Sequence, residues 1–306
     1  MYFSKFSDAI QSLLDTAKQV SLKYKDYKGD TYDEKTGLTI TKNELQCFIT
    51  LNYSLAEYIK TGEKFYVPDS TSIIEGKVID SVTKEFIRLP FDRTVLLSES
   101  FINNEDAEKF NTWKISIALS ANEIRKISPS HIDFDDTDFA IFSVILLPDK
   151  MWAIDVGAIC KLPKDKDGLE LYEINNPWME RLSKVLSYYN KTLKDEINDD
   201  LMSICNLCLM LGLKNVSTKG VNPDVKLNKA RAARGNLPFY SYHVLKVDNE
   251  VWDKHEHANS KEFYGRRAHL RRGHIRRLQD GRRVFVKSAM VKGSILGFVD
   301  KEYHLK

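Results

Sequence analysis

The residues with the most distinctive chemistry are basic and lie near the end of the chain, between Lys261 and Lys292. This segment holds eleven lysines and arginines against two acidic residues, so it carries +9 while the whole chain carries +3. Eight of the fourteen arginines are here, and the planar fork of a guanidinium matches phosphate oxygens better than the point charge of lysine does. Such a local excess of positive charge predicts binding to a phosphate-bearing partner, above all nucleic acid, either DNA or RNA.

The same segment has the pattern of a β-hairpin. Asp280-Gly281 is a strong two-residue turn signal, because a type I′ turn needs positive φ at both central positions. This turn would pair Leu278 with Arg283, and alternation along the strands would then separate a basic face from an apolar face. The basic face would carry Arg272, His274, Arg276, Arg283 and Lys287, and the apolar face would carry Ile275, Val284, Val286 and Met290.

The predicted nucleic-acid-binding set includes most of the basic residues of this hairpin. Its members are Arg271, Arg272, His274, Arg276, Arg277, Arg282, Arg283 and Lys287, with Phe285 available to stack on a base. A shorter basic run comes earlier, at Lys226, Lys229, Arg231 and Arg234, and extends the expected anion-binding surface. The alternative is a solvated hairpin whose charges only keep it soluble and stop its edge strand from pairing with another chain. A few charges would be enough for that purpose.

Histidines accompany the arginines, at His255, His257, His269 and His274, and Tyr264 lies among them. These are ingredients of a metal-independent ribonuclease, in which one histidine takes the 2′-hydroxyl proton and another protonates the leaving oxygen. In the predicted hairpin, however, His269 and His274 point to opposite faces, which opposes their use as an acid–base pair. Nuclease activity is therefore an alternative, and whether the chain is an enzyme stays open.

No metal or cofactor is predicted. Cys205 and Cys208 have the spacing of half a zinc site, but they lie in an apolar helical pattern and no second cysteine pair exists. We therefore predict two small buried hydrophobic residues. The acidic residues between Asp133 and Asp138 could hold Mg²⁺, but no nuclease pattern accompanies them, so a helix cap or solvated turn is expected. No nucleotide-binding loop, dinucleotide fingerprint, nucleophile elbow or kinase signature is present.

The elements that must position these residues predict an α+β fold, with a mostly antiparallel sheet, packed helices and the basic C-terminal β-hairpin. Apolar residues from Phe3 to Val20 recur at helical spacing and predict a first helix. Further helices are expected over 44–60, from Asn176-Pro177, and over 198–212. Strands are expected over 65–67, 86–89, 95–97, 114–119, 139–147, 151–162, 240–247 and 295–303. Residues 214–237 are expected to form a long polar connection.

Two domains are predicted, an N-terminal α+β domain over 1–222 and a basic, His/Arg-rich β domain over 223–306. A composition of 42% hydrophobic and 29% charged residues is typical of a globular protein. The first 24 residues are amphipathic and do not predict a signal peptide, and no apolar run approaches the roughly 18 residues of a membrane span. Four cysteines in such a chain indicate reduced thiols and a cytoplasmic setting.

Three stretches together resemble a family of tailed-bacteriophage and prophage proteins without an established activity. They are Arg88 to Leu96 (RLPFDRTVL), Asn228 to His243 (beginning NKAR and ending LPFYSYH), and His269 to Leu278 (HLRRGHIRRL) with its return strand GRRVFV. The resemblance covers mainly residues 226–306. It implies a phage-borne protein acting in the host cytoplasm.

The sequence thus favours a phage-encoded, cytoplasmic nucleic-acid-binding protein that acts on host or phage nucleic acid or on a complex containing it. One alternative is the metal-independent nuclease described above. Another is an interaction protein that inhibits or triggers a host defence factor, for which the acidic remainder of the chain, at −6, offers a surface. Neither a membrane nor a cofactor enters these predictions.

Overall fold

The computed structural model describes residues 2–25, 31–33, 38–67, 87–103, 109–127, 135–161, 170–173, 193–247, 269–271, 274–278, 280, 282–286 and 289–291. The chain forms two compact units. The first comprises Met1–Cys208 with Lys219–Val244, and the second comprises Leu209–Thr218 with Leu245–Lys306. The predicted boundary after residue 222 differs from this division, because residues 223–244 group with the first unit.

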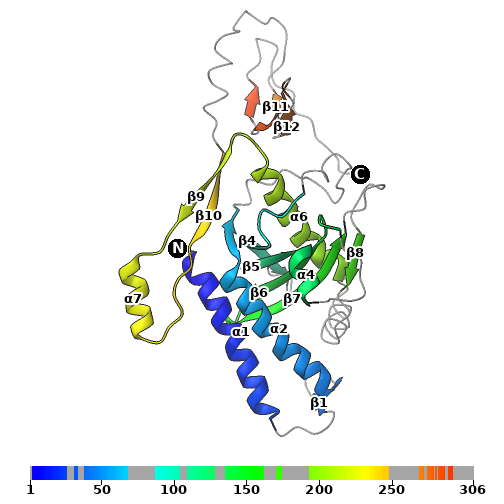
Figure 1. The fold of residues 1–306 in the computed structure, drawn as a ribbon, viewed down its shortest axis with the longest axis vertical. Coiled ribbons are helices and arrows are strands. Elements are labelled where there is room, and N and C mark those ends of the chain that lie inside the picture. The colour runs from blue at the N-terminus through cyan, green and yellow to red at the C-terminus, as the bar shows by residue number, and fades with distance from the viewer. Residues whose placement is uncertain are drawn as a thin grey trace, which may run out of the picture. The chain divides into compact units, whose positions relative to one another are not determined.

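An eight-stranded sheet is the central element (Figure 1). Its strands, in spatial order, are β8 (Glu170–Glu173), β7 (Trp152–Lys161), β6 (Phe139–Leu146), β5 (Lys109–Ser120), β4 (Arg93–Asn103), β3 (Glu63–Tyr66), β10 (Tyr242–Val247) and β9 (Val216–Val221). Strands β4 to β8 form an antiparallel meander, whereas β3 runs parallel to both β4 and β10. The predicted α+β class with a mostly antiparallel sheet is confirmed.

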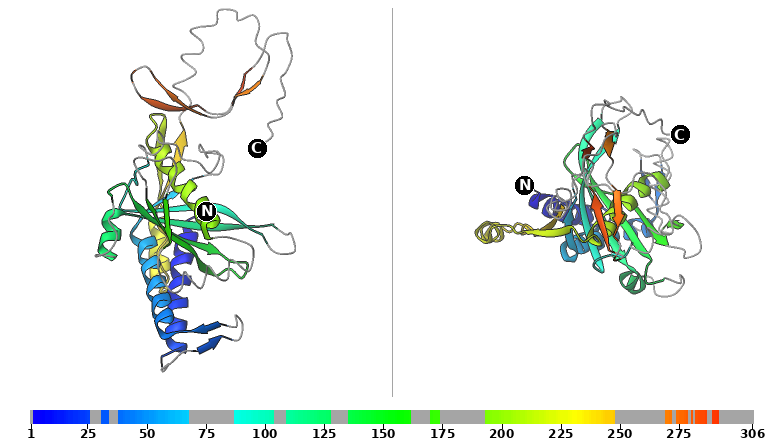
Figure 2. Two further views of the ribbon diagram at one scale, coloured as in Figure 1. Left: turned by 90° about the vertical axis from the view of Figure 1, so that its right-hand side faces the viewer. Right: turned by 90° about the horizontal axis from the view of Figure 1, so that it is seen from above.

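Two helices cover one face of this sheet (Figure 2). They are α1 (Phe3–Lys23) and α2 (Lys42–Thr61), joined through the short antiparallel pair β1 (Thr31–Asp33) and β2 (Leu38–Ile40). The predicted apolar stripe of α1 is buried against α2 and against inward residues of β4, β5 and β7. Helix α2 begins with a capping box, in which Thr41 and Glu44 exchange side-chain and backbone hydrogen bonds.

The opposite face of the sheet meets α6 (Leu193–Leu211). Lys114 and Ser116 of β5 alternate with the residues that face α1 and α2, and both contact Asp200 of α6. The predicted burial of Cys205 and Cys208 in this helix is confirmed. Burial raises the pKa of the Cys208 thiol to about 12.

Two predictions about local structure were wrong, and two lie outside the described residues. The connection 214–237 contains β9 and a helix, α7 (Val225–Ala233), which the sequence pattern did not indicate. Residues 87–89 do not form a strand, although Ile87 is buried. The helix expected from Asn176-Pro177 and the strand expected over 295–303 fall outside the described residues. A short helix, α4 (Ala121–Ile127), follows β5.

The C-terminal hairpin exists, but its predicted register was wrong by one residue. Strand β12 (His274–Arg277) pairs with β13 (Arg283–Val286) so that Arg277 lies opposite Arg283. The same register continues in β11 (His269–Arg271) and β14 (Ala289–Val291). The Leu278 amide donates to the Arg282 carbonyl at 2.7 Å, so the loop that closes the hairpin has three residues instead of the predicted two. The Asp280 carboxylate accepts the Arg282 amide and guanidinium, which stabilises the longer loop.

This shift redistributes the residues between the two faces of the hairpin. Arg276 now lies opposite Val284, and Arg283 falls on the other face. The single basic face predicted from the sequence is therefore wrong. Val284 is nonetheless only 2% exposed, so the prediction that its side chain faces inward is confirmed. Arg276 is exposed. None of the described helices is long and apolar enough to cross a membrane.

Candidate nucleic-acid interface

Helix α7 is the cationic element that the structure describes most completely. None of its nine residues is buried. Lys226, Lys229 and Arg231 lie within it and Arg234 caps its C-terminal end, whereas the acidic residue nearest in sequence, Asp224, is its N-cap. In the described part of the chain, no carboxylate forms an ion pair with Lys226, Lys229 or Arg234. Net positive charge on an exposed helix is the electrostatic footprint of an anion-binding surface.

The ends of α7 are fixed by local hydrogen bonds. Asp224 Oδ1 accepts from the Lys226 amide at 2.7 Å, which satisfies one of the free amides at the helix start. At the other end Gly235 adopts φ +71°. The Gly235 and Asn236 amides donate to the carbonyls of Ala232 and Arg231, both at 3.0 Å. This is a Schellman motif, and it requires the left-handed conformation that glycine adopts without strain.

The segment after the helix folds back along one side of α7 and holds it there. Asn228 makes two hydrogen bonds to the Phe239 backbone, at 3.0 Å to the carbonyl and at 2.8 Å from the amide. Arg231 Nε donates to the Leu237 carbonyl at 2.7 Å, and its guanidinium lies 3.9 Å from the centre of the Phe239 ring. We call these contacts the clasp. A nine-residue helix is too short to be stable alone in water, so the clasp maintains it.

The clasp segment is itself anchored to the first unit. Ser7 of α1 donates to the Pro238 carbonyl at 2.6 Å, and the Phe3 and Phe239 rings are 6.4 Å apart. The Lys64 ammonium lies 4.9 Å from the centre of the Tyr240 ring. Helix α7 is thus held at the β9–β10 edge of the sheet and extends beyond it (Figures 1 and 2).

Lys64 is a buried cation with a structural role. Its ammonium donates to the carbonyls of Lys60 and Gly62, at 3.1 and 2.7 Å, where α2 ends. A cation is favourable at a helix C-terminus because the last carbonyls carry partial negative charge. Burial lowers the pKa of Lys64 to about 8, against the opposing effect of the Glu63 charge. The buried position suits helix capping better than contact with a ligand.

Because the clasp uses Asn228 and Arg231, it leaves the opposite side of α7 uncovered. Residues spaced by three and four positions lie on this side, at Lys226, Lys229, Ala230 and Ala233, and all four are exposed. We call these four residues the outward face. From the sequence, the basic run from Lys226 to Arg234 was expected to lie in a loop and to extend the anion-binding surface. The structure instead places it on a helix with a held side and a free side.

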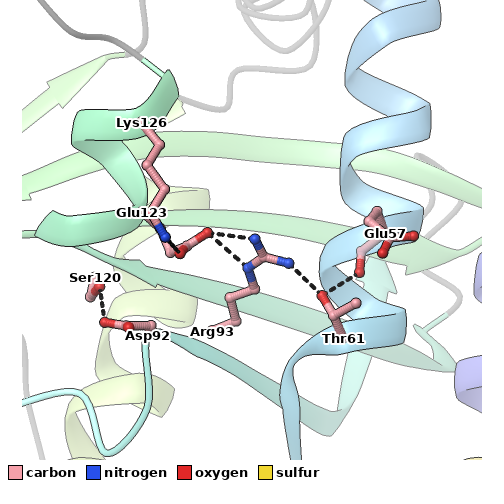
Figure 3. A network of polar contacts seen from close by, with 7 residues as sticks. All are labelled: Glu57, Thr61, Asp92, Arg93, Ser120, Glu123 and Lys126. Atoms are coloured by element: carbon pink, nitrogen blue, oxygen red, sulfur yellow. Dashed lines mark hydrogen bonds and ion pairs between the residues drawn. The ribbon is translucent and has the colours of Figure 1, made fainter.

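The Arg88–Leu96 stretch, which carries part of the family resemblance, makes structural contacts (Figure 3). Arg93 donates to Glu123 Oε2 from Nε at 2.8 Å, and its Nη2 lies 2.7 Å from the same oxygen. A third nitrogen donates to Thr61 Oγ1 at 2.6 Å. Asp92 accepts from the Ser120 hydroxyl at 2.6 Å, and this contact lowers the pKa of the Asp92 carboxyl. The network joins the end of α2, the start of β4 and the start of α4.

The structure describes few side chains of the predicted hairpin site. Arg276 is exposed. Arg282 is also exposed, but it forms an ion pair with Asp280, so a phosphate would have to compete with that carboxylate. The hydrogen bond between them raises the pKa of Arg282 and lowers that of Asp280. The side chains of Arg271, Arg272, His274, Arg277, Arg283, Phe285 and Lys287 lie outside the described residues.

The other candidate groups do not assemble into a described site. His255, His257 and Tyr264 lie outside the described residues, as does Asp133. Asp138 accepts from the Asp135 amide at 2.9 Å, and Arg125 lies 3.1 Å from Asp136. These contacts match the turn expected there. Among the described residues no group of three or more His, Cys, Asp or Glu is arranged to hold a metal ion.

One histidine that the sequence did not single out for chemistry has a clear partner. His243 of β10 lies 2.6 Å from Glu63 of β3, through Nε2 and Oε1, and both side chains are partly exposed. The two strands are parallel neighbours in the sheet, and the Phe65 ring lies 5.4 Å from the imidazole. The pairing depends on the order of strands in the sheet, which no local sequence pattern indicates. We interpret it as a contact that fixes β10 beside β3.

A scan against protein-family models, a search of curated proteins and a search of solved structures each found no match. The resemblance to phage-borne proteins therefore stays a prediction. The described residues leave α7 as the best-defined candidate interface.

Proposed function

We propose that this protein binds nucleic acid through two cationic elements, α7 of the first unit and the C-terminal hairpin of the second. In line with the family resemblance, we propose that it is phage-encoded and acts on host or phage nucleic acid in the host cytoplasm. The observation that carries the proposal is that α7 buries none of its residues, yet is held in place by the clasp. A helix that adds nothing to the core has its use at the surface.

The charges on α7 define the kind of ligand. Lys226, Lys229 and Arg234 are exposed and have no carboxylate partner among the described residues. Nucleic acid offers closely spaced phosphates whose condensed counterions are released on binding, which favours association with such a cluster. Arg276 adds exposed positive charge in the second unit, whereas the charge of Arg282 is balanced by Asp280.

A titration of labelled oligonucleotides, followed by fluorescence anisotropy, tests the proposal. Lys226→Gln combined with Lys229→Gln should weaken duplex binding by about 60-fold in roughly 0.1 M salt, if each lysine neutralises one phosphate. The matched control is Lys18→Gln combined with Lys25→Gln, two exposed lysines, one in the second half of α1 and one just after it, which should bind as wild type does. Failure of the wild-type protein to bind any oligonucleotide would refute the proposed function. Cleavage of labelled RNA in the presence of EDTA would instead support the nuclease alternative.

A second candidate, protein binding, has one specific observation in its favour. Val225 and Leu227 of α7 are 68% and 44% exposed, and large exposed apolar residues next to cations also occur at protein interfaces. An acidic host defence factor is the partner that this surface would fit. Association with such a protein should survive treatment with nucleases, whereas association through a shared nucleic acid should not.

A further inference from the structure

The outward face of α7 carries small residues as well as cations, and the attraction of an anion does not by itself require small residues. Small residues, Ala230 and Ala233, stand beside Lys226 and Lys229, and both alanines are exposed. Side chains of this size let a helix backbone approach another surface closely. Cations that acted only by attraction at a distance would not need such an approach.

The dimensions of α7 match one nucleic-acid surface. From Lys226 to Arg234 the helix rises about 12 Å, at 1.5 Å per residue. The major groove of B-form DNA is about 12 Å wide and admits an α-helix. Cations at the two ends of α7 are therefore separated by roughly the distance between the phosphate strands on either side of the groove.

Other nucleic acids fit this helix less well. The major groove of A-form RNA is too deep and narrow for a helix. Single-strand binding uses exposed aromatic rings as stacking platforms, and residues 225–234 contain no aromatic residue. The nearest ring in the clasp, that of Phe239, is covered by the Arg231 guanidinium.

We infer that α7 enters the major groove of duplex DNA, with Lys226 and Arg234 on opposite phosphate strands and Ala230 and Ala233 against the base edges. This inference rests on the proposed function and narrows its ligand to one class. Alanine can contact the thymine methyl group in that groove, so it also predicts a preference for sites that contain thymine.

Substitutions that add bulk without changing charge test the inference. Ala230→Phe and Ala233→Phe should each weaken binding to duplex DNA at least ten-fold, because the larger ring prevents the helix from seating in the groove. The matched control is Ala232→Phe, which alters an exposed alanine on a different side of the same helix and should bind as wild type does. Circular dichroism of all three variants checks that α7 remains folded.

The outcomes separate this inference from the proposed function. Equal effects of the three phenylalanine substitutions, or duplex RNA bound as tightly as duplex DNA, would overturn groove binding while leaving nucleic-acid binding intact. Absence of binding to every oligonucleotide would overturn both. Competition provides a readout without substitutions, since a major-groove ligand such as methyl green should displace the protein and a minor-groove ligand such as netropsin should not. The reverse order would contradict the inference.

Discussion

The buried ion pair between the sheet and α6 gives a sharp prediction about stability. Lys114 Nζ and Asp200 Oδ2 are 2.8 Å apart, and the two side chains are 7% and 2% exposed. Ser116 also donates its hydroxyl to Asp200 Oδ1 at 2.7 Å. Asp200→Ala would leave the ammonium buried without this carboxylate and remove the acceptor of the Ser116 hydroxyl. Breaking a buried pair costs about 3–5 kcal/mol, and a buried hydroxyl without a partner costs about 1–3 kcal/mol.

These two effects overlap, so we expect Asp200→Ala to lower the free energy of unfolding by about 4–6 kcal/mol, a large part of the roughly 5–15 kcal/mol typical of a folded protein. Urea titration followed by tryptophan fluorescence measures it, because Trp113 adjoins Lys114 in sequence and Trp152 is buried in the core. The control is Lys114→Met combined with Asp200→Leu, which should lose only about 1–3 kcal/mol, because neither charge of the pair is left buried alone and only the Ser116 hydroxyl loses its acceptor. A loss below about 1 kcal/mol in the single variant, or a double variant as unstable as that single variant, would refute the reasoning.

Three further predictions concern other polar contacts. Arg93→Gln should lower the free energy of unfolding by about 1.5–3 kcal/mol. Burial acts to raise the pKa of Glu123, but hydrogen bonds from Lys126 and Arg93 lower it below its ordinary 4.5. The wild-type protein should therefore lose stability as the pH falls below 4.5, and the variant should lose less. Asn228→Ala should remove two of the three clasp hydrogen bonds and make α7 the first site of proteolytic cleavage, while thermal unfolding of the core changes little. Because the pKa of Lys64 is lowered from 10.5 to about 8, folding should gain stability as the pH rises through this interval, and Lys64→Met should abolish that rise in urea titrations. Unchanged acid unfolding, unchanged digestion or an unchanged alkaline profile, respectively, would contradict them.

Periodic apolar patterns predicted the elements that bury a side. The stripe beginning at Phe3 gave α1, the 44–60 pattern gave α2, and the apolar run before Pro148 gave the β6–β7 hairpin. In that hairpin Asp149 accepts from the Met151 amide at 3.0 Å, and Lys150 adopts a positive φ, as a tight turn requires. These elements were predictable because burial imposes the period.

The features that the sequence did not indicate depend on contacts between residues, and not on the spacing of apolar residues. Helix α7 has no buried side, so no apolar period marks it, and the clasp residue Asn228 reads as an ordinary polar residue. The parallel pairing of β3 depends on the order of strands in the sheet. The hairpin register followed from the Asp280 carboxylate holding a three-residue loop, against the two-residue loop expected for Asp-Gly.

The most direct test of the proposed function is the salt dependence of duplex binding with and without the charges of α7. Each phosphate contact contributes about −0.9 to the slope of log affinity against log salt on duplex DNA. Replacing Lys226, Lys229 and Arg234 together by glutamine should therefore flatten the wild-type slope by about 2.7, without unfolding the helix. A slope that is shallow in the wild-type protein, or that is the same in the variant, would contradict nucleic-acid binding through α7.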